Sequence, residues 1–305
     1  MKDVKDYQIK SLKRQILLSN LKILIVGVIL VAEIVVILSY FAKNGLFDEV
    51  KHSKNRVAVI NYNREVTEDY TSRVMEKMDK IRDDKSYKSV LFIMNSPGGS
   101  PTASEELSEY LKDFQKDKNI TMYVQSIAAS GGYYIASAIK PLYANKNAIV
   151  GSIGVIMPHY NLKELAKKVG VEEDYLMAGK FKKPISLLEK IDRENREYIK
   201  KHLLEPTYRN FIESVAKNRG ISVERLKPFT EGKIYVANME EIQGILIDKI
   251  ISLYRVKALI RESLKGRDIE FVNIDLEKKR SFLPKIEVDL GLREILDRVG
   301  FSNSL

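Results

Sequence analysis

The most informative residue of the chain is a serine that follows an apolar, β-branched run. The run ITMYVQ (residues 120–125) leads into AASGGYY (residues 128–134), in which alanines and glycines keep bulk away from Ser130. A peptide carbonyl could therefore approach the Ser130 hydroxyl, and the N-terminus of a following helix would add positive potential. Ser130 is a candidate nucleophile for acyl transfer, although a serine in this position also serves as an ordinary helix N-cap.

A second motif, NSPGGSP at residues 95–101, follows the run SVLFIM in the same way. Its paired glycines, Gly98 and Gly99, expose main-chain N–H groups with no side chain in the way. Beside a helix N-terminus, such donors can hold the oxyanion that develops when a nucleophile attacks a carbonyl. A tight turn between a strand and a helix explains Pro and Gly at these positions at least as well.

A serine hydroxyl needs a base, and a lysine can replace the usual histidine if burial leaves its amine neutral. No histidine stands in a suggestive context, and His159, in the stretch MPHY, is interpreted as a loop or surface residue. The stretch AGKFKKP (178–184) offers three lysines beside a flexible Ala-Gly turn: Lys180, Lys182 and Lys183. The residues alone do not choose among them, and three exposed lysines in a basic loop fit equally well.

The composition of the chain excludes several other chemistries. Its 305 residues include no cysteine, which rules out disulfides, thiolate nucleophiles and Cys-based metal sites. We expect no metal and no cofactor, since the histidines are far apart and show no metal-ligand spacing: His52, His159 and His202. The formal net charge is +10, but Lys and Arg alternate with Asp and Glu, so no basic stripe indicates a nucleic-acid partner.

The elements that must position these motifs alternate along the chain. Strands are predicted at 57–62, 89–94, 120–125, 142–144 and 174–177. Helices are predicted at 68–81, 103–114 and 189–218. We also expect a capping box formed by Asn238 and Glu241, and a docked terminal helix that carries Leu290, Ile295, Leu296 and Val299. Alternation of this kind is typical of an α/β domain.

An apolar run of twenty residues at 23–42 precedes this domain. At about 1.5 Å per residue it can cross the roughly 30 Å hydrocarbon layer of a membrane. It is longer than the core of a cleavable signal peptide, so we predict a retained anchor, with Glu33 as a tolerated polar residue or a contact between helices. Six basic residues in 1–22 against four in 43–56 place the N-terminus in the cytoplasm and the domain outside.

Five motifs together resemble, in order and spacing, the short bacterial form of signal peptide peptidase A in peptidase family S49: NSPGGS, AASGGYY, VGSIGV (150–155), AGKFKK and EGKIY (231–235). The resemblance covers residues 57–264. It implies a ClpP/crotonase-like α/β fold, a superhelix of stacked ββα units, preceded by one N-terminal transmembrane helix. The expected organisation is therefore a cytoplasmic N-terminus (1–22), an anchor (23–42), a linker (43–55), a Ser-Lys peptidase domain (56–275) and a C-terminal tail (276–305).

The resemblance also implies roles for individual residues. Ser130 would be the nucleophile and Lys182 the general base. The N–H groups of Gly98 and Gly99 would form an oxyanion hole, while two supporting residues would complete the site: Ser152, which would orient the lysine amine, and Gly131. Family members commonly carry aspartate after the catalytic lysine, whereas this chain has Lys183-Pro184, which leaves the choice among the three lysines to the resemblance.

The activity that the resemblance implies is a serine endopeptidase that degrades remnant signal peptides at the cytoplasmic membrane. Protomers would form a ring and share each dyad between neighbours. Three alternatives remain: a membrane protease of the stomatin-associated type, a crotonase-type acyl-CoA lyase or hydratase with acidic catalytic residues, and a non-catalytic membrane scaffold. The natural substrate, cleavage preference and ring size do not follow from the sequence.

Overall fold

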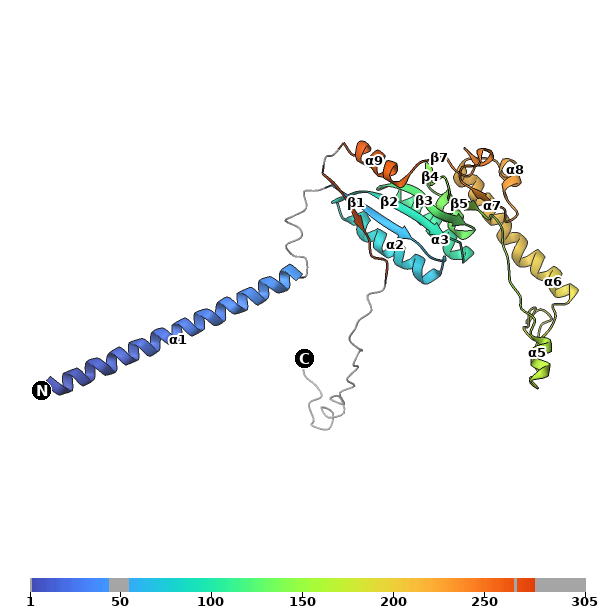
Figure 1. The fold of residues 1–305 in the computed structure, drawn as a ribbon. Helices are drawn as coiled ribbons and strands as arrows, with labels where there is room; N and C mark the ends of the chain where they lie inside the picture. The colour runs from blue at the N-terminus through green and yellow to red at the C-terminus, as the bar shows by residue number, and fades with distance from the viewer. Residues whose placement is uncertain (1, 44–54, 266–267, 278–305) are drawn as a thin grey trace, which may run out of the picture. The chain divides into compact units, whose positions relative to one another are not determined.

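The computed structural model describes residues 2–43, 55–265 and 268–277, which include an N-terminal helix and an α/β domain (Figure 1). One sheet organises the domain, with strands in the order β6-β5-β3-β2-β1-β8. The strands span Ile234–Val236, Ile149–Gly151, Asn119–Ala129, Tyr87–Ser96, Asn55–Tyr62 and Ile269–Asn273 in that order. Off this path, β4 (Leu142–Ala144) pairs with β3 and with β7 (Lys249–Ile250). Every pairing is parallel except β5 with β6.

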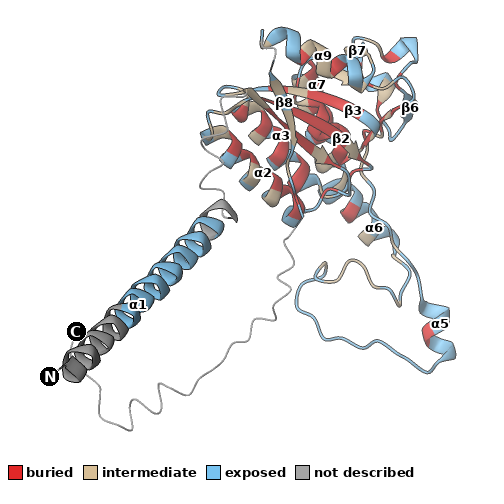
Figure 2. Cartoon of the chain, turned by 60° about the vertical axis from the view of Figure 1, so that its left-hand side comes forward, coloured by how far each residue is buried: buried red, intermediate tan, exposed pale blue. Residues whose placement is uncertain are grey.

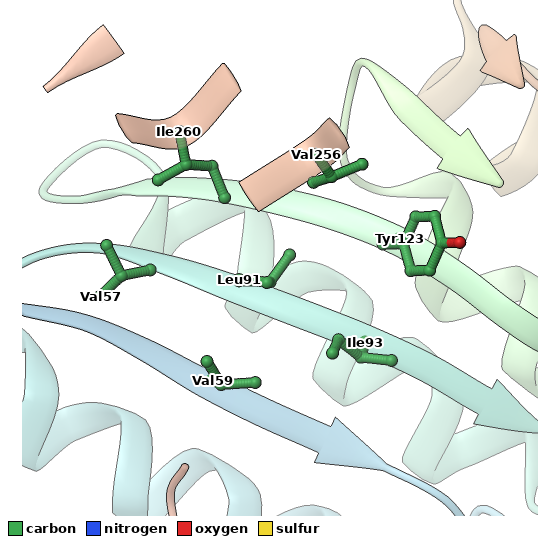
Figure 3. Close-up of a cluster of buried hydrophobic side chains, with 7 residues drawn as sticks. All are labelled: Val57, Val59, Leu91, Ile93, Tyr123, Val256 and Ile260. Carbon is green, nitrogen blue, oxygen red and sulfur yellow. The ribbon is translucent and has the colours of Figure 1, made fainter. Parts of the chain in front are cut away.

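The central strands are buried on both faces, which explains why their sequences read as continuous apolar runs. One face packs against α9 (Leu253–Ser263) through a cluster shown in Figure 3: Val57, Val59, Leu91, Ile93, Tyr123, Val256 and Ile260. Alternate residues point to the other face, where the Tyr62 ring lies 4.8 Å from that of Tyr70 on α2 (Glu68–Asp83). The helix α3 (Pro101–Phe114) contacts α2 and buries Leu107, Leu111 and Phe114.

Four of the five predicted strands and the first two predicted helices are present. The prediction of a strand at 174–177 is wrong, because these residues pair with no strand in the described chain and the side chain of Leu176 is fully exposed. The predicted capping box is also wrong. Residues Glu240–Ile242 form a single 3₁₀ turn whose N-cap is Met239, and no side chain caps it. The predicted terminal helix lies outside the described residues.

Residues 155–192, called the arm below, pack against little else. Among them only Ala166, on α5 (Lys163–Lys168), is buried, and the segment is almost entirely exposed in Figure 2. The outgoing and returning parts of the arm are joined by a hydrogen bond, in which the Leu162 N–H donates to the Leu187 carbonyl over 2.7 Å. His159, interpreted from sequence as a loop or surface residue, is half-buried and its Nε2 lies 2.8 Å from the Ser186 carbonyl.

The predicted helix at 189–218 begins later and is interrupted by a wider turn. It consists of α6 (Arg193–Ile199), a π turn (Lys200–Leu204) and α7 (Glu205–Arg219). Pro206 explains the π turn, because its ring has no N–H to donate and would collide with the carbonyl four residues earlier in a regular α-helix. The helical turn is wider by one residue instead, and the Glu205 N–H donates to the Lys200 carbonyl, five residues earlier.

A buried ion pair fixes the end of α7 to the sheet. Arg219, 2% exposed, donates to both carboxylate oxygens of Asp248 over 2.8 and 2.9 Å, and Asp248 also accepts the Leu142 N–H of β4. Burial acts to raise the pKa of Asp248, but the hydrogen bonds from Arg219 and Leu142 and the Arg219 charge outweigh it and hold the pKa below its ordinary value. The contribution of the Asp248 carboxylate to the free energy of unfolding is complete above about pH 4. It is lost as the pH falls through the lowered pKa that Asp248 has in the folded state.

The N-terminal helix α1 spans Lys2–Lys43 and extends well beyond the predicted anchor on its N-terminal side. Its apolar part, Leu17–Ser39, is 23 residues long and is apolar enough to cross a membrane. At about 1.5 Å per residue this part measures about 35 Å, slightly more than the hydrocarbon thickness of a bilayer. Of residues 275–305, the structure describes only 275–277.

Candidate active site

Ser130 occupies a sharp turn between β3 and α4 (Gly131–Ser137), with φ 50° and ψ −125°. A non-glycine residue with positive φ is strained, and such strain gathers at functional sites. The Ser130 N–H donates to the Gly151 carbonyl over 2.9 Å, which ties the turn to β5. Although Ser130 stands at the N-cap position of α4, its hydroxyl makes no capping hydrogen bond in the described chain. An ordinary capping role therefore does not account for this serine.

Strained backbone is concentrated around this turn. Among the described residues, four that are not glycine have positive φ, and three of them line one cleft: Ser130 (50°), Ser152 (54°) and Glu231 (64°). The fourth is Lys265, on the turn that follows α9. Because each such conformation costs on the order of 1–3 kcal/mol, three around one cleft mark it as the functional region.

The cleft has a volume of about 1190 Å³. Its floor is the turn at Ser130 and the loop at Gly98 and Gly99, and one wall comes from the π turn and α7. The sequence did not predict that wall. Leu204, Tyr208 and Phe211 belong to the predicted helix at 189–218, and their spacing is that of an ordinary amphipathic helix. The remaining wall is formed by Ser152, by residues 154–156 and by the turn at Glu231 and Gly232.

The glycine-rich loop is held against the Ser130 turn with almost no space between them. A Cβ on Gly98 would lie 2.7 Å from the Ser130 Cβ and 2.9 Å from the Gly131 nitrogen. The loop is fixed from its other side by Val66, whose N–H donates to the Gly98 carbonyl and whose carbonyl accepts the Ser100 N–H, over 2.7 and 2.9 Å. Glycine at position 98 is thus required by close approach as well as by its φ of 110°.

The N–H groups of this loop are not equally available. The Gly98 N–H donates to the Ser96 hydroxyl over 3.2 Å. Within the described chain, the N–H groups of Gly99 and Gly131 have no acceptor in hydrogen-bonding geometry, and the Gly99 nitrogen faces the Gly131 Cα. Of the two glycines expected to form an oxyanion hole, Gly99 has a free donor, and Gly131, expected only to support the site, offers the second.

Ser152 lies beside Ser130 on the β5–β6 side of the cleft. Its N–H donates to the Lys233 carbonyl over 2.6 Å, continuing the antiparallel pairing of β5 with β6. The preceding residue, Gly151, accepts the Ser130 N–H. Ser152 and Ser130 are therefore brought together, and both residues line the same cleft. The expected role of Ser152 in orienting the lysine amine stays a prediction.

Lys182 does not line the cleft of its own chain; it lies exposed on the arm. Its two neighbours are engaged by carboxylates: Lys180 lies 2.5 Å from Glu194, and Lys183 forms an ion pair with Glu173. The hydrogen bond from Lys183 holds the pKa of Glu173 below its ordinary value, so this carboxylate stays charged. Lys182 is the one lysine of the three whose amine has no partner in the described part of the chain.

The ionisable groups of the cleft include four glutamates: Glu65, Glu105, Glu205 and Glu231. All four are exposed. Burial raises the pKa of Tyr134, whose hydroxyl donates to the Ser214 hydroxyl over 2.8 Å and whose ring lies 5.0 Å from that of Phe211. Within the described residues, no group of three His, Asp or Glu side chains could hold a metal ion.

If the cleft catalyses acyl transfer, replacing Gly98 by alanine is expected to lower kcat by about 10²–10³-fold, comparable with the loss of an oxyanion-hole donor. The new methyl group would stand where the substrate oxyanion must approach the Gly131 N–H. Steady-state kinetics of the purified variant checks this. Gly170→Ala is the matched control, because Gly170 also has positive φ, at 70°, and has open space around it. Equal kinetics of the two variants would contradict the assignment.

Comparison with known families gives two overlapping matches. The sequence profile described as Peptidase family S49 matches residues 112–266, and the profile described as Clp protease matches residues 46–154. The second match contains the glycine-rich loop and Ser130, and it confirms the expected ClpP-like α/β fold.

Individual relatives also bear protease or peptidase names. A protein of Methanocaldococcus jannaschii that bears a protease name is 35% identical over 57% of this chain and 55% of its own length. A similarly named protein of Synechocystis is 30% identical over 77% of this chain and 84% of its own length. A protein of Enterococcus faecium that bears the name signal peptide peptidase SppA is 32% identical over 58% of this chain and 51% of its own length. The chain thus spans about half the length of the first and third relatives.

Proposed function

The chain belongs to peptidase family S49, and on this premise we propose that it is a membrane-anchored serine endopeptidase that uses Ser130 and Lys182. The observation that carries the proposal is the strained turn at Ser130. It places a hydroxyl that makes no capping hydrogen bond in a cleft, beside the N–H groups of Gly99 and Gly131, which have no acceptor in the described chain. A nucleophile next to unoccupied oxyanion donors is the arrangement that acyl transfer requires.

The proposed reaction proceeds in two stages. The Ser130 oxygen attacks the scissile carbonyl while the Lys182 amine takes the hydroxyl proton, and the oxyanion is held by the N–H groups of Gly99 and Gly131. Collapse of this intermediate breaks the C–N bond, and Lys182 passes the proton to the leaving amine. Lys182 then takes a proton from water, which attacks the carbonyl of the acyl-enzyme. The ester bond to Ser130 breaks, Lys182 returns the proton to the Ser130 oxygen, and the new carboxyl end of the peptide is released.

Each dyad is proposed to combine Ser130 of one protomer with Lys182 of a neighbour in a ring. Two features support this. Lys182 lies outside the cleft of its own chain, and the arm that carries it exposes many apolar side chains, among them Ile156, Val169 and Leu176 at 87%, 67% and 102%. An exposed apolar surface of this extent is typical of a protein interface.

The proposed substrates are remnant signal peptides and other unfolded apolar segments near the membrane. Three observations support this proposal: Leu17–Ser39 is long and apolar enough for an anchor, the charge bias favours a domain outside the cytoplasm, and the Enterococcus relative bears a signal peptide peptidase name. The crotonase-type alternative needs acidic catalytic residues. The cleft does have four glutamates, but all are exposed, and membership of family S49 favours peptide hydrolysis.

The test uses the full chain purified in detergent. We expect a fluorophosphonate probe to label the protein at Ser130, as mapped by mass spectrometry of the digested adduct, and to block cleavage of a fluorogenic signal-peptide substrate. A folded, oligomeric protein that neither reacts with the probe nor cleaves the peptide would overturn the enzyme assignment. Labelling at another serine would overturn the choice of nucleophile.

A further inference from the structure

The segment that carries Lys182 is attached to α6 by an aromatic stack. The rings of Phe181 and Tyr198 lie parallel, with centroids 4.4 Å apart and an interplanar angle of 10°. Tyr198 also contacts His202, whose ring centroid is 4.9 Å away. On the same side, Lys180 pairs with Glu194, one turn before Tyr198 on α6. Two residues in succession therefore connect the lysine segment to one helix.

Contacts on the other side hold the segment within the arm. Lys183 pairs with Glu173 and lies over the ring of Tyr175, 3.9 Å from its centroid. The Lys182 N–H donates to the Gly179 carbonyl over 3.0 Å, which closes a turn. Lys182 is thus flanked by neighbours with several contacts each, while its own amine stays free and exposed. This arrangement fixes the main chain around a side chain that remains available.

The helix that receives the stack also builds the cleft. Beyond Tyr198, the π turn and α7 place Lys200, Leu204 and Tyr208 along the wall beside Ser130. One continuous helical segment therefore carries both the docking position of the lysine segment and a wall of the cleft. The aromatic stack, together with the Lys180–Glu194 pair, links the lysine segment to this helical segment. In the proposed ring, the amine held in this way reaches Ser130 of a neighbouring protomer.

We propose that Phe181 and Tyr198 are positioning residues, which act on the reaction by holding the Lys182 amine in place through the stacked rings. The inference rests on the proposed function, in which Lys182 is the base. Without the stack, the lysine segment keeps its ion pairs at the surface, but these are weak and allow the backbone to move. Displacement of a catalytic group by about 1 Å can cost on the order of 10²-fold in rate.

The decisive variant is Tyr198→Ala in the full chain purified in detergent. We expect kcat to fall by about 10–100-fold while KM changes by less than about twofold, because the base is misplaced and the cleft wall is left unchanged. Tyr198→Phe should restore wild-type kinetics, since the Tyr198 hydroxyl has no hydrogen bond in the described chain and only the ring contributes.

Two further variants make the result interpretable. Phe181→Leu keeps an apolar side chain but removes the stack from the other side, so it should reproduce the loss in kcat even if Tyr198→Ala folds poorly. Tyr254→Ala removes a tyrosine that is 79% exposed on α9, and it should behave as the wild type. All variants are compared by circular dichroism and by gel filtration.

Three outcomes would overturn the inference. They are unchanged kcat in Tyr198→Ala and Phe181→Leu, an equal loss in Tyr198→Phe, and a loss confined to KM. A failure of the proposed function is distinguishable, because it would appear in the wild type as absence of cleavage, or as full activity retained by a variant that lacks the Lys182 amine.

Discussion

Ser130→Ala protein is expected to cleave peptides more than about 10⁴-fold more slowly than the wild type, because the substitution removes the proposed nucleophile. The substitution should leave the fold intact. The Ser130 hydroxyl makes no capping hydrogen bond in the described chain, and alanine carries the same Cβ as serine, so the substitution adds no bulk at this positive φ. The loss therefore measures chemistry and not stability.

The measurement compares kcat and fluorophosphonate labelling of Ser130→Ala with those of Ser126→Ala. Ser126 lies on the same strand, β3, but is exposed and does not line the cleft, so its removal should change neither quantity. Residual cleavage by Ser130→Ala within tenfold of the wild-type rate would assign the nucleophile to a different residue, or the activity to a contaminant.

Lys182→Met is expected to lower kcat by about 10³–10⁴-fold, since methionine preserves the length of the side chain but cannot accept a proton. Lys163→Met is the matched control, because Lys163 is an exposed lysine of the same arm on α5. A similar loss in both variants would mean that the charge of the arm matters and that Lys182 has no particular role.

Co-expression of the Ser130→Ala and Lys182→Met chains distinguishes a shared dyad from one within a single protomer. If neighbours supply the two residues, random mixing of equal amounts restores about a quarter of the sites in a cyclic assembly. Each such site combines Ser130 of a Lys182→Met chain with Lys182 of a Ser130→Ala chain. If each chain provides its own dyad, no mixed site is complete, and activity stays at the level of the two parents.

The parts of the fold that could be predicted are those with a local cause. The run SVLFIM is apolar after Ser89 because β2 is buried on both faces, and α2 and α3 show helical spacing because each buries one apolar side. The stretch at 174–177 has a similar apolar character, but a strand also needs a partner, and no strand of the described chain lies beside these residues.

The features of the site that sequence could not provide depend on distant contacts. Ser130 and Ser152 were identified by motif, yet their positive φ values follow from how β3, β5 and the glycine-rich loop fit together. Gly131 appeared as a small neighbour of the nucleophile, whereas its free N–H is visible only once its surroundings are known. Tyr198 gave no signal at all, because a tyrosine on a charged helix is ordinary until its ring is found against Phe181.

Strand β8 completes the sheet by pairing with β1. The side chain of Asn61 donates a hydrogen bond to that of Asn273, although the two residues are 212 positions apart in the chain. While β1, β2 and β3 follow one another in the chain and can associate early, the closing of this edge must wait for the end of the domain to be synthesised. Until then β1 has an open edge of unpaired N–H and carbonyl groups, which invites association with other nascent chains. A chain that stops before residue 269 would thus contain every residue of the cleft and still be prone to aggregate.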